Sequence, residues 1–173
     1  MKIYGICLSN SKNSLNRRFL DEIIQHANGE NIEYSALDFP MYQDDTEPPS
    51  NLIQLCEKLK DADGVIFSSP EYNGSFSPFG KNVIDWISIL GEFNGSYMKT
   101  ALTETPFMMC SVSPGKLGGA TALGHLCYVI KRLGAINIKT FATIGGYNPE
   151  TYDYSDSISM VRDFVQYVES HKK

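Results

Sequence analysis

The feature that most constrains the fold is a regular alternation of short apolar segments with amphipathic helical stretches. The apolar segments are residues 2–8, 32–37, 64–69, 107–112 and 135–144. Near-continuous apolar sequence that is too short for a helix is typical of strands buried on both faces. Strands that alternate with helices form a parallel sheet with helices on both sides, so we expect an α/β fold.

Five stretches with apolar residues at helical spacing separate or follow these strands. They lie near residues 15–27, 52–59, 79–90, 123–133 and 158–168. Asn28-Gly29 predicts the end of the first helix, and Ser77-Pro78 predicts the start of the third. Residues 91–105 are less regular and are expected to form a loop with a turn at Asn94-Gly95. A doubly wound sheet of five parallel strands favours the flavodoxin-like strand order 2-1-3-4-5.

Length and composition indicate one globular domain that spans residues 1–173. Hydrophobic residues make up 42% of the chain and charged residues 20%, and the formal net charge is −5. A mildly acidic chain lacks the positive surface that binds nucleic acid or an anionic membrane. No stretch approaches the ~20 apolar residues of a membrane span, and the N-terminal apolar run is shorter than the core of a signal peptide. We therefore expect a cytoplasmic protein without membrane partners.

The cysteines and histidines form no pattern typical of catalysis or metal binding. The four cysteines include no C-x-x-C pair, and Cys7 and Cys110 lie within predicted strands, where a free thiol packs as a small hydrophobe. The three histidines lie on predicted helices without ligand or triad spacing. We expect no disulfide, no metal ion and no catalytic side chain.

In the strand order 2-1-3-4-5, the loops after strands one, three and four meet at the carboxyl edge of the sheet, where ligands bind. The first loop, residues 9–16, is rich in small hydroxyl and amide residues and leads directly into a helix. Unpaired N–H groups and the helix dipole suit a phosphate there. The candidate hydrogen-bonding residues are Ser9, Ser11, Ser14 and Asn16, with Lys12 and Arg17 as candidate charges. The same residues are equally compatible with an ordinary strand-to-helix connection in which a serine caps the helix.

The other two loops suit a flat ring with polar edges. Residues 69–76 contain a tyrosine and three turn residues, and their backbone N–H groups are candidate partners for the pyrimidine edge of a flavin. Glu71 in this loop is a candidate structural or partner contact rather than a general acid. Residues 113–119 contain three glycines, which permit close approach of the backbone to a ligand. Their spacing is not G-x-G-x-x-G, so a Rossmann dinucleotide site is not predicted.

Three motifs in and beside these loops carry a family resemblance. They are Ser69-Pro-Glu-Tyr-Asn-Gly-Ser75, Lys81-Asn-Val-Ile-Asp-Trp86 and Ser113-Pro-Gly-Lys-Leu-Gly-Gly-Ala120, with Asp38-Phe-Pro-Met-Tyr42 as a fourth, shorter match. Together they resemble the NADPH-dependent FMN reductase family, which includes azoreductases and quinone or chromate reductases. The resemblance extends over residues 1–145.

The resemblance implies a flavodoxin-like domain that binds FMN. The first loop then holds the phosphate, the P-E-Y-N loop holds the isoalloxazine, and the third loop lies beside the ring, with Gly119 at its end. The cofactor-binding residues expected on this basis are Ser9, Ser11, Lys12, Ser14, Leu15, Asn16, Pro70, Glu71, Tyr72, Asn73, Gly74, Ser113, Gly115 and Gly118. Ser11, next to Lys12, stands where the family usually has an arginine.

The implied activity is an oxidoreductase reaction in which NADPH or NADH reduces bound FMN. The flavin then passes electrons to a small acceptor such as a quinone, an azo compound, a free flavin or a metal oxyanion. Two alternatives remain open: a non-enzymatic flavin-binding electron carrier or redox-responsive module, and a degenerate member that has lost FMN. Members of the family form dimers or tetramers, so a homodimer or homotetramer is expected. Trp86, Phe93 and Tyr97 are candidate interface residues, although Trp86 is equally compatible with the core.

Overall fold

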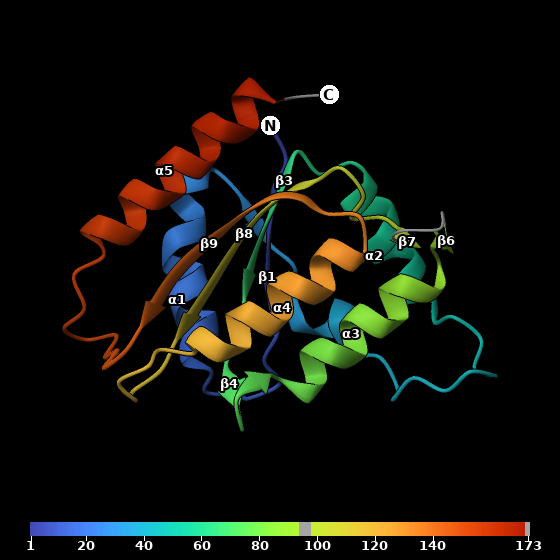
Figure 1. The fold of residues 1–173 in the computed structure, drawn as a ribbon, viewed down its shortest axis with the longest axis horizontal. Helices are drawn as coiled ribbons and strands as arrows, with labels where there is room; N and C mark the ends of the chain where they lie inside the picture. Colours follow the sequence, from blue (N-terminus) through green and yellow to red (C-terminus); the bar gives the residue numbers. More distant parts are fainter. Residues whose placement is uncertain (94–97, 172–173) are drawn as a thin grey trace.

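The computed structural model describes residues 1–93 and 98–171 and contains one five-stranded parallel sheet (Figure 1). In spatial order the strands are β2 (Glu30–Asn31), β1 (Ile3–Cys7), β3 (Gly64–Ser68), β8 (Pro106–Val112) and β9 (Ile136–Ile144). Each neighbouring pair is parallel. The predicted flavodoxin-like order 2-1-3-4-5 is therefore confirmed.

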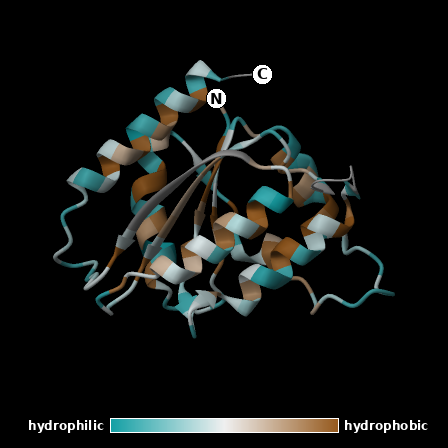
Figure 2. Ribbon diagram, in the orientation of Figure 1, coloured by the Kyte–Doolittle hydropathy of each residue, from teal (hydrophilic) through white to brown (hydrophobic). Residues whose placement is uncertain are grey.

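Helices cover both faces of the sheet. In Figure 1, α1 (Leu15–Ile24) and α5 (Ser155–Ser170) lie on one side, and α2 (Ser50–Lys60), α3 (Pro78–Ile89) and α4 (Ala120–Arg132) lie on the other. Figure 2 shows brown, hydrophobic residues on the helix faces that turn toward the sheet, whereas the outer faces of the helices are largely polar. No helix in the described parts of the chain is both long enough and apolar enough to cross a bilayer.

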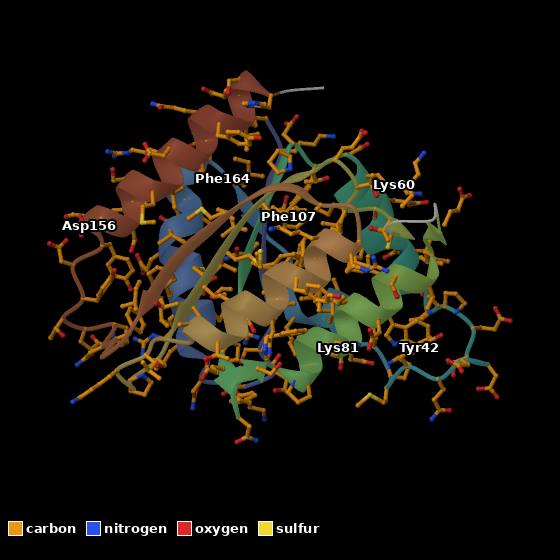
Figure 3. All side chains as sticks on the ribbon, in the orientation of Figure 1. Tyr42, Lys60, Lys81, Phe107, Asp156 and Phe164 are labelled. Carbon is orange, nitrogen blue, oxygen red and sulfur yellow. The ribbon has the colours of Figure 1, made fainter. Side chains whose placement is uncertain are left out.

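Alternate residues of the central strands enter two separate hydrophobic clusters. Phe67 and Phe107 stack with their ring centroids 5.3 Å apart in the cluster beneath α2, α3 and α4. The adjacent residues Ile66 and Met108 face α1 and α5, where Phe164 of α5 joins them (Figure 3). This period of two explains why both faces of the strands are apolar in sequence.

Local capping signals are confirmed. The Ser14 and Ser77 side chains accept hydrogen bonds from the backbone N–H groups of Arg17 and Gly80, and Pro78 occupies the first turn of α3. Helix α1 gives way to a 3-10 turn that ends at Asn28, a residue in the left-handed conformation at φ 47°. Asn28-Gly29 therefore terminates the helical segment as predicted.

The second strand was predicted wrongly at residues 32–37. The β2 pairing with β1 covers only Glu30 and Asn31, and Tyr34–Leu37 forms a 3-10 turn. Ile32 still donates a backbone hydrogen bond to Gly5 of β1 (2.8 Å), but the chain then turns away beneath α2. The turn places the side chains of Ile32 and Leu37 in the core, so their apolar character reflects burial and not a strand.

The segment between α3 and β8 was expected to be a loop, but it contains a short antiparallel pair. Glu92–Phe93 forms β6 and Met98–Lys99 forms β7. The turn signal at residues 94–95 lies outside the described residues, as does Tyr97. Trp86 has no exposed surface, so it belongs to the core.

Candidate cofactor site at the carboxyl edge of the sheet

The three loops that follow β1, β3 and β8 emerge at one edge of the sheet, at the bottom of Figure 1. Strand β1 lies next to β3, and β3 lies next to β8. The strands end at Cys7, Ser68 and Val112. The parallel register therefore brings together the loops whose residues were predicted to bind a cofactor.

The first loop presents a series of unpaired backbone N–H groups. In the described part of the chain, no hydrogen-bond acceptor lies against the backbone N–H of Asn10 or of residues 12–16. These groups precede or begin α1, whose first turn contains no acidic residue. Successive free N–H groups at a helix N-terminus attract an anion, because they combine donors with the positive end of the helix dipole. The loop therefore fits the phosphate that was expected there.

Asn16 connects this loop to the centre of the sheet. Its Nδ2 donates to the carbonyl oxygen of Val112 (3.0 Å), and its Oδ1 accepts from the backbone N–H of Val112 (3.0 Å). The Ser68 hydroxyl donates to the Asn16 carbonyl oxygen at 3.1 Å. Asn16 thus joins α1 to the ends of β3 and β8, and the group it offers a phosphate is its backbone N–H.

The second loop is a β-hairpin that sequence reasoning missed. Glu71–Tyr72 forms β4 and Ser75–Phe76 forms β5, joined by Asn73 (φ 52°) and Gly74 (φ 75°). Positive φ at both central residues is the type I′ geometry for which Asn-Gly is the strongest sequence signal. The hairpin projects Tyr72, which is 44% exposed, from the carboxyl edge.

Glu71 fixes this hairpin to α4. Its Oε2 accepts a hydrogen bond from the backbone N–H of Ala122 (3.1 Å) in the first turn of α4. The N-cap of that helix is Gly119, which has no side chain to serve as a cap. Glu71 supplies the missing acceptor, in agreement with its predicted structural role.

The third loop packs closely against the end of β9. A Cβ atom on Gly118 would lie 2.6 Å from the backbone nitrogen of Ile144, and Gly118 has a φ of 61°. The Ser113 carbonyl oxygen accepts from the N–H of Tyr147 (2.9 Å), and the Gly115 carbonyl oxygen accepts from Gly146 (3.0 Å). The glycines here serve a close approach between two loops of the same chain.

The motif of α3 has a structural role of its own. The Asn82 Oδ1 accepts from the N–H of Tyr42 (2.8 Å), and the Trp86 Nε1 donates to the carbonyl oxygen of Pro40 (2.7 Å). Figure 3 shows Tyr42 on the loop beside α3, with Lys81 near the start of that helix. Two of the motifs that carry the family resemblance therefore contact each other.

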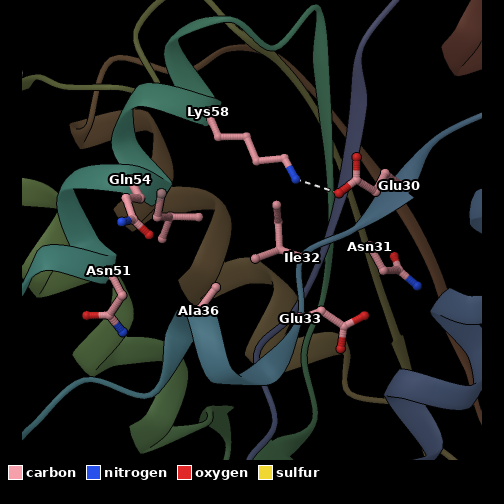
Figure 4. Close-up of a pocket in the computed structure, with 9 residues that line it drawn as sticks. Glu30, Asn31, Ile32, Glu33, Ala36, Asn51, Gln54 and Lys58 are labelled. Carbon is pink, nitrogen blue, oxygen red and sulfur yellow. Dashed lines mark hydrogen bonds and ion pairs between the residues drawn. The ribbon is translucent and has the colours of Figure 1, made fainter.

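Two pockets lie beside the carboxyl edge rather than in it. One, of about 330 Å³, is lined by Ser75 and Phe76 of the hairpin together with Lys81, His125, Tyr128 and Val129 of α3 and α4. The other, of about 230 Å³, lies between β2 and α2, where Lys58 pairs with Glu30 (Figure 4). Neither contains residues of the first loop.

The titratable groups at this edge include a buried thiol. Burial raises the pKa of the Cys7 thiol, which lies at the end of β1, so the thiol is protonated at neutral pH. Within residues 1–93 and 98–171, no group of three or more His, Cys, Asp or Glu side chains could hold a metal ion. The site consequently offers hydrogen-bond donors and surfaces for a ligand rather than a reactive side chain.

Comparison with known proteins identifies the family. The model of the NADPH-dependent FMN reductase family matches residues 1–148. The chain belongs to this family. It is 32% identical over 164 residues to the "uncharacterized protein MG342 homolog" of Mycoplasma pneumoniae, covering 92% of this chain and 96% of the relative.

Two further comparisons bear on this FMN reductase family member. A quinone reductase of Escherichia coli is 30% identical over 148 residues, which cover 83% of this chain and 75% of that enzyme. The solved structure of the flavoenzyme NAD(P)H:(acceptor) oxidoreductase FerB of Paracoccus denitrificans superposes with a TM-score of 0.82 at 25% identity, covering 98% of each chain. The fold predicted from the alternating segments and the family predicted from the motifs are both confirmed.

Proposed function

We propose that this protein is an NAD(P)H-dependent FMN oxidoreductase that passes electrons from reduced FMN to a small acceptor such as a quinone. The observation that carries the proposal is the series of free N–H groups at residues 10 and 12–16, placed at the start of α1 in a member of the FMN reductase family. An anion site of this kind suits the phosphate of FMN. The hairpin and the third loop lie at the same edge of the sheet as the phosphate loop, where the proposal places the ring.

The proposal assigns binding roles to three groups of residues. The phosphate is held by the first loop, and the isoalloxazine lies against the hairpin, with the third loop beside it. The assigned residues are Ser9, Ser11, Lys12, Ser14, Leu15 and Asn16 for the phosphate, Pro70 to Gly74 for the ring, and Ser113, Gly115 and Gly118 beside it. When bound, FMN supplies hydride and single-electron chemistry.

The protein's own part in the reaction is to bind and orient. The Tyr72 ring, exposed at the hairpin, offers an aromatic surface to a flat ligand. Glu71 keeps the hairpin in place through the first turn of α4, and Asn16 keeps the phosphate loop in place through Val112. No side chain needs to transfer a proton in this arrangement.

The test is a titration of the purified protein with FMN, followed by NADPH or NADH under anaerobic conditions. We expect quenching of FMN fluorescence on binding and bleaching of the oxidised flavin band on addition of the donor. Tyr72→Ala is expected to weaken FMN binding by about threefold to tenfold through loss of an aromatic contact. Tyr167→Ala, which changes a tyrosine at the far end of α5, is the matched control and is expected to bind FMN as the wild type does.

The outcomes separate the alternatives. Binding without bleaching by either donor would refute the reductase and favour an electron carrier. An absence of binding at micromolar protein would refute any flavin role and identify a member of the family that has lost FMN. Equal losses in Tyr72→Ala and Tyr167→Ala would refute the assignment of the hairpin to the ring.

The proposal also extends to the oligomeric state and the cellular location of the protein. We propose one FMN-binding domain over residues 1–173 that acts in the cytoplasm as a homodimer or homotetramer. The free thiols of all four cysteines support a reducing compartment. Leu117 and Tyr128, which are 74% and 69% exposed, support an interface with a second copy on the side of α4. Light scattering that shows a monomer at micromolar concentration would refute the oligomer.

A further inference from the structure

Arg17 is bound to the inner side of the first loop. It lies in the first turn of α1, and its Nη2 donates to the Ser9 carbonyl oxygen at 2.8 Å. Its Nη1 donates to the Ser11 carbonyl oxygen at 3.4 Å. Arg17 lines a pocket of about 230 Å³ together with Asp21 and Glu33. In the described part of the chain it forms no ion pair with either carboxylate. The hydrogen bonds of the guanidinium are therefore made to the loop backbone.

These two hydrogen bonds orient the peptide groups of the loop. In a trans peptide, the N–H points opposite to the C=O of the same plane. Because the carbonyl oxygens of Ser9 and Ser11 point toward Arg17, the N–H groups of Asn10 and Lys12 point away from it. Both N–H groups belong to the unpaired series described above. Arg17 thus holds the carbonyl oxygens of Ser9 and Ser11 on its own side of the loop, so the N–H groups of Asn10 and Lys12 lie on the opposite side.

A stack of aromatic rings supports the guanidinium from outside the loop. The Arg17 Cζ lies 5.6 Å from the centroid of the Tyr34 ring, within the range of a cation–π contact. The Tyr34 ring in turn stacks on Phe79 of α3, with centroids 5.4 Å apart and an interplanar angle of 21°. Tyr34 lies in the 3-10 turn after β2 and belongs to none of the three loops. The position of Arg17 is therefore set by elements distant from it in sequence.

We propose that Arg17 is a positioning residue that shapes the first loop for a phosphate without itself contacting the phosphate. The inference rests on the proposed FMN-binding function. Because the effect is transmitted through the peptide groups of residues 9–12, it acts on the phosphate end of the ligand alone. A change at Arg17 is thus expected to weaken the binding of FMN and to leave that of riboflavin, which lacks the phosphate, nearly unaltered.

The experiment compares FMN and riboflavin affinities by fluorescence titration. We expect Arg17→Ala to weaken FMN by about tenfold to a hundredfold, the range for the loss of hydrogen bonds from a charged donor. Riboflavin binding should change less than about threefold, which also shows that the variant is folded. Arg18→Ala is the matched control. It removes the same charge from the next residue of the chain, whose side chain pairs with Glu150 and not with the first loop. It should leave both affinities close to those of the wild type.

Three further variants separate positioning from direct contact. Arg17→Lys keeps the charge but not the two-pronged donor, so a positioning role predicts a loss close to that of Arg17→Ala. Tyr34→Leu removes the supporting ring while leaving Arg17 in place and should weaken FMN by about twofold to fivefold, whereas Tyr34→Phe should not.

Several results would overturn the inference. Full FMN affinity in Arg17→Lys would show that a point charge on the phosphate suffices. Equal losses for FMN and riboflavin, or equal losses in Arg17→Ala and Arg18→Ala, would show a general effect on folding or on charge. If the wild type binds FMN and Arg17→Ala binds it equally well, the inference is refuted and the proposed function is not. A wild-type protein that fails to bind FMN would refute the proposed function together with the inference.

Discussion

Replacement of Asn16 by alanine tests how strongly the phosphate loop depends on the sheet beneath it. The substitution leaves both the N–H and the C=O of Val112 without their partner, and Val112 is only 2% exposed. Each buried polar group left unpaired costs about 1–3 kcal/mol, so the two together cost about 2–6 kcal/mol. Water that enters the vacated space recovers part of this, and we expect a loss of about 3 kcal/mol in the free energy of unfolding.

The assay is urea denaturation of the protein without added flavin. A loss of about 3 kcal/mol is a large share of a total stability of about 5–15 kcal/mol, and it corresponds to a fall in Tm of about 6–12 °C. Asn13→Ala is the matched control, because Asn13 is an exposed asparagine in the same loop. We expect it to change the free energy of unfolding by less than about 0.5 kcal/mol. A value for Asn16→Ala that equals this control would refute the reasoning.

Asn16→Asp adds a test that depends on pH. The isosteric carboxylate still accepts from the Val112 N–H, but it faces the Val112 carbonyl oxygen and needs a proton to donate to it. The pKa of this carboxyl group should therefore be higher in the folded protein than in the unfolded chain. Because the folded state then binds more protons, stability should rise as the pH falls from 7 toward 5. A stability that fell over this range relative to wild type would contradict the assigned contacts.

Three further predictions concern other parts of the molecule. Glu71→Ala removes the acceptor for the Ala122 N–H and should cost about 0.5–2 kcal/mol in urea denaturation, while Glu71→Gln, which keeps an acceptor, should cost less; equal losses would contradict the capping role. Ser111→Ala removes a buried hydroxyl that has no hydrogen-bond partner among the residues that the structure describes, so the free energy of unfolding should stay unchanged or rise by up to about 1 kcal/mol. A clear decrease would show that the hydroxyl has a partner. Burial raises the pKa of the Cys110 thiol from 9.0 to about 12, so the folded protein keeps this proton while the unfolded chain loses it, and stability should fall as the pH rises from about 9 toward 12. Cys110→Ala should flatten that decline in a series of denaturation curves, and an unchanged slope would contradict the assignment.

Much of the fold could be predicted because its signals are local or periodic. The serine caps at Ser14 and Ser77 each act within three residues, and the strand order follows from the number and spacing of apolar segments. The second strand was misplaced because its pairing is short. Only Glu30 and Asn31 pair with β1, and the burial of Ile32 and Leu37 results from packing against α2 and α3 that no local pattern reveals.

The candidate site was likewise predictable only in part. Its loops could be located from sequence, because parallel strands end at one edge. The roles of individual side chains could not be assigned in this way, since they depend on contacts between distant residues. Asn16 pairs with Val112, which is 96 residues away, and Glu71 caps a helix that begins about 50 residues later. The Asn73-Gly74 hairpin was missed although it has a local signal, and it could have been found from its type I′ preference.

Trp86 is an intrinsic fluorescent probe of the fold. It is the one tryptophan of the chain, so all indole emission comes from a single place on α3. Its ring is fully buried, packs edge-on against Tyr42 with centroids 5.2 Å apart, and donates to the Pro40 carbonyl oxygen. Separation of the 39–42 segment from α3 would expose the indole to water and shift its emission to longer wavelength, even with the rest of the sheet intact. Emission spectra recorded beside circular dichroism can therefore distinguish detachment of this one loop from loss of the whole fold.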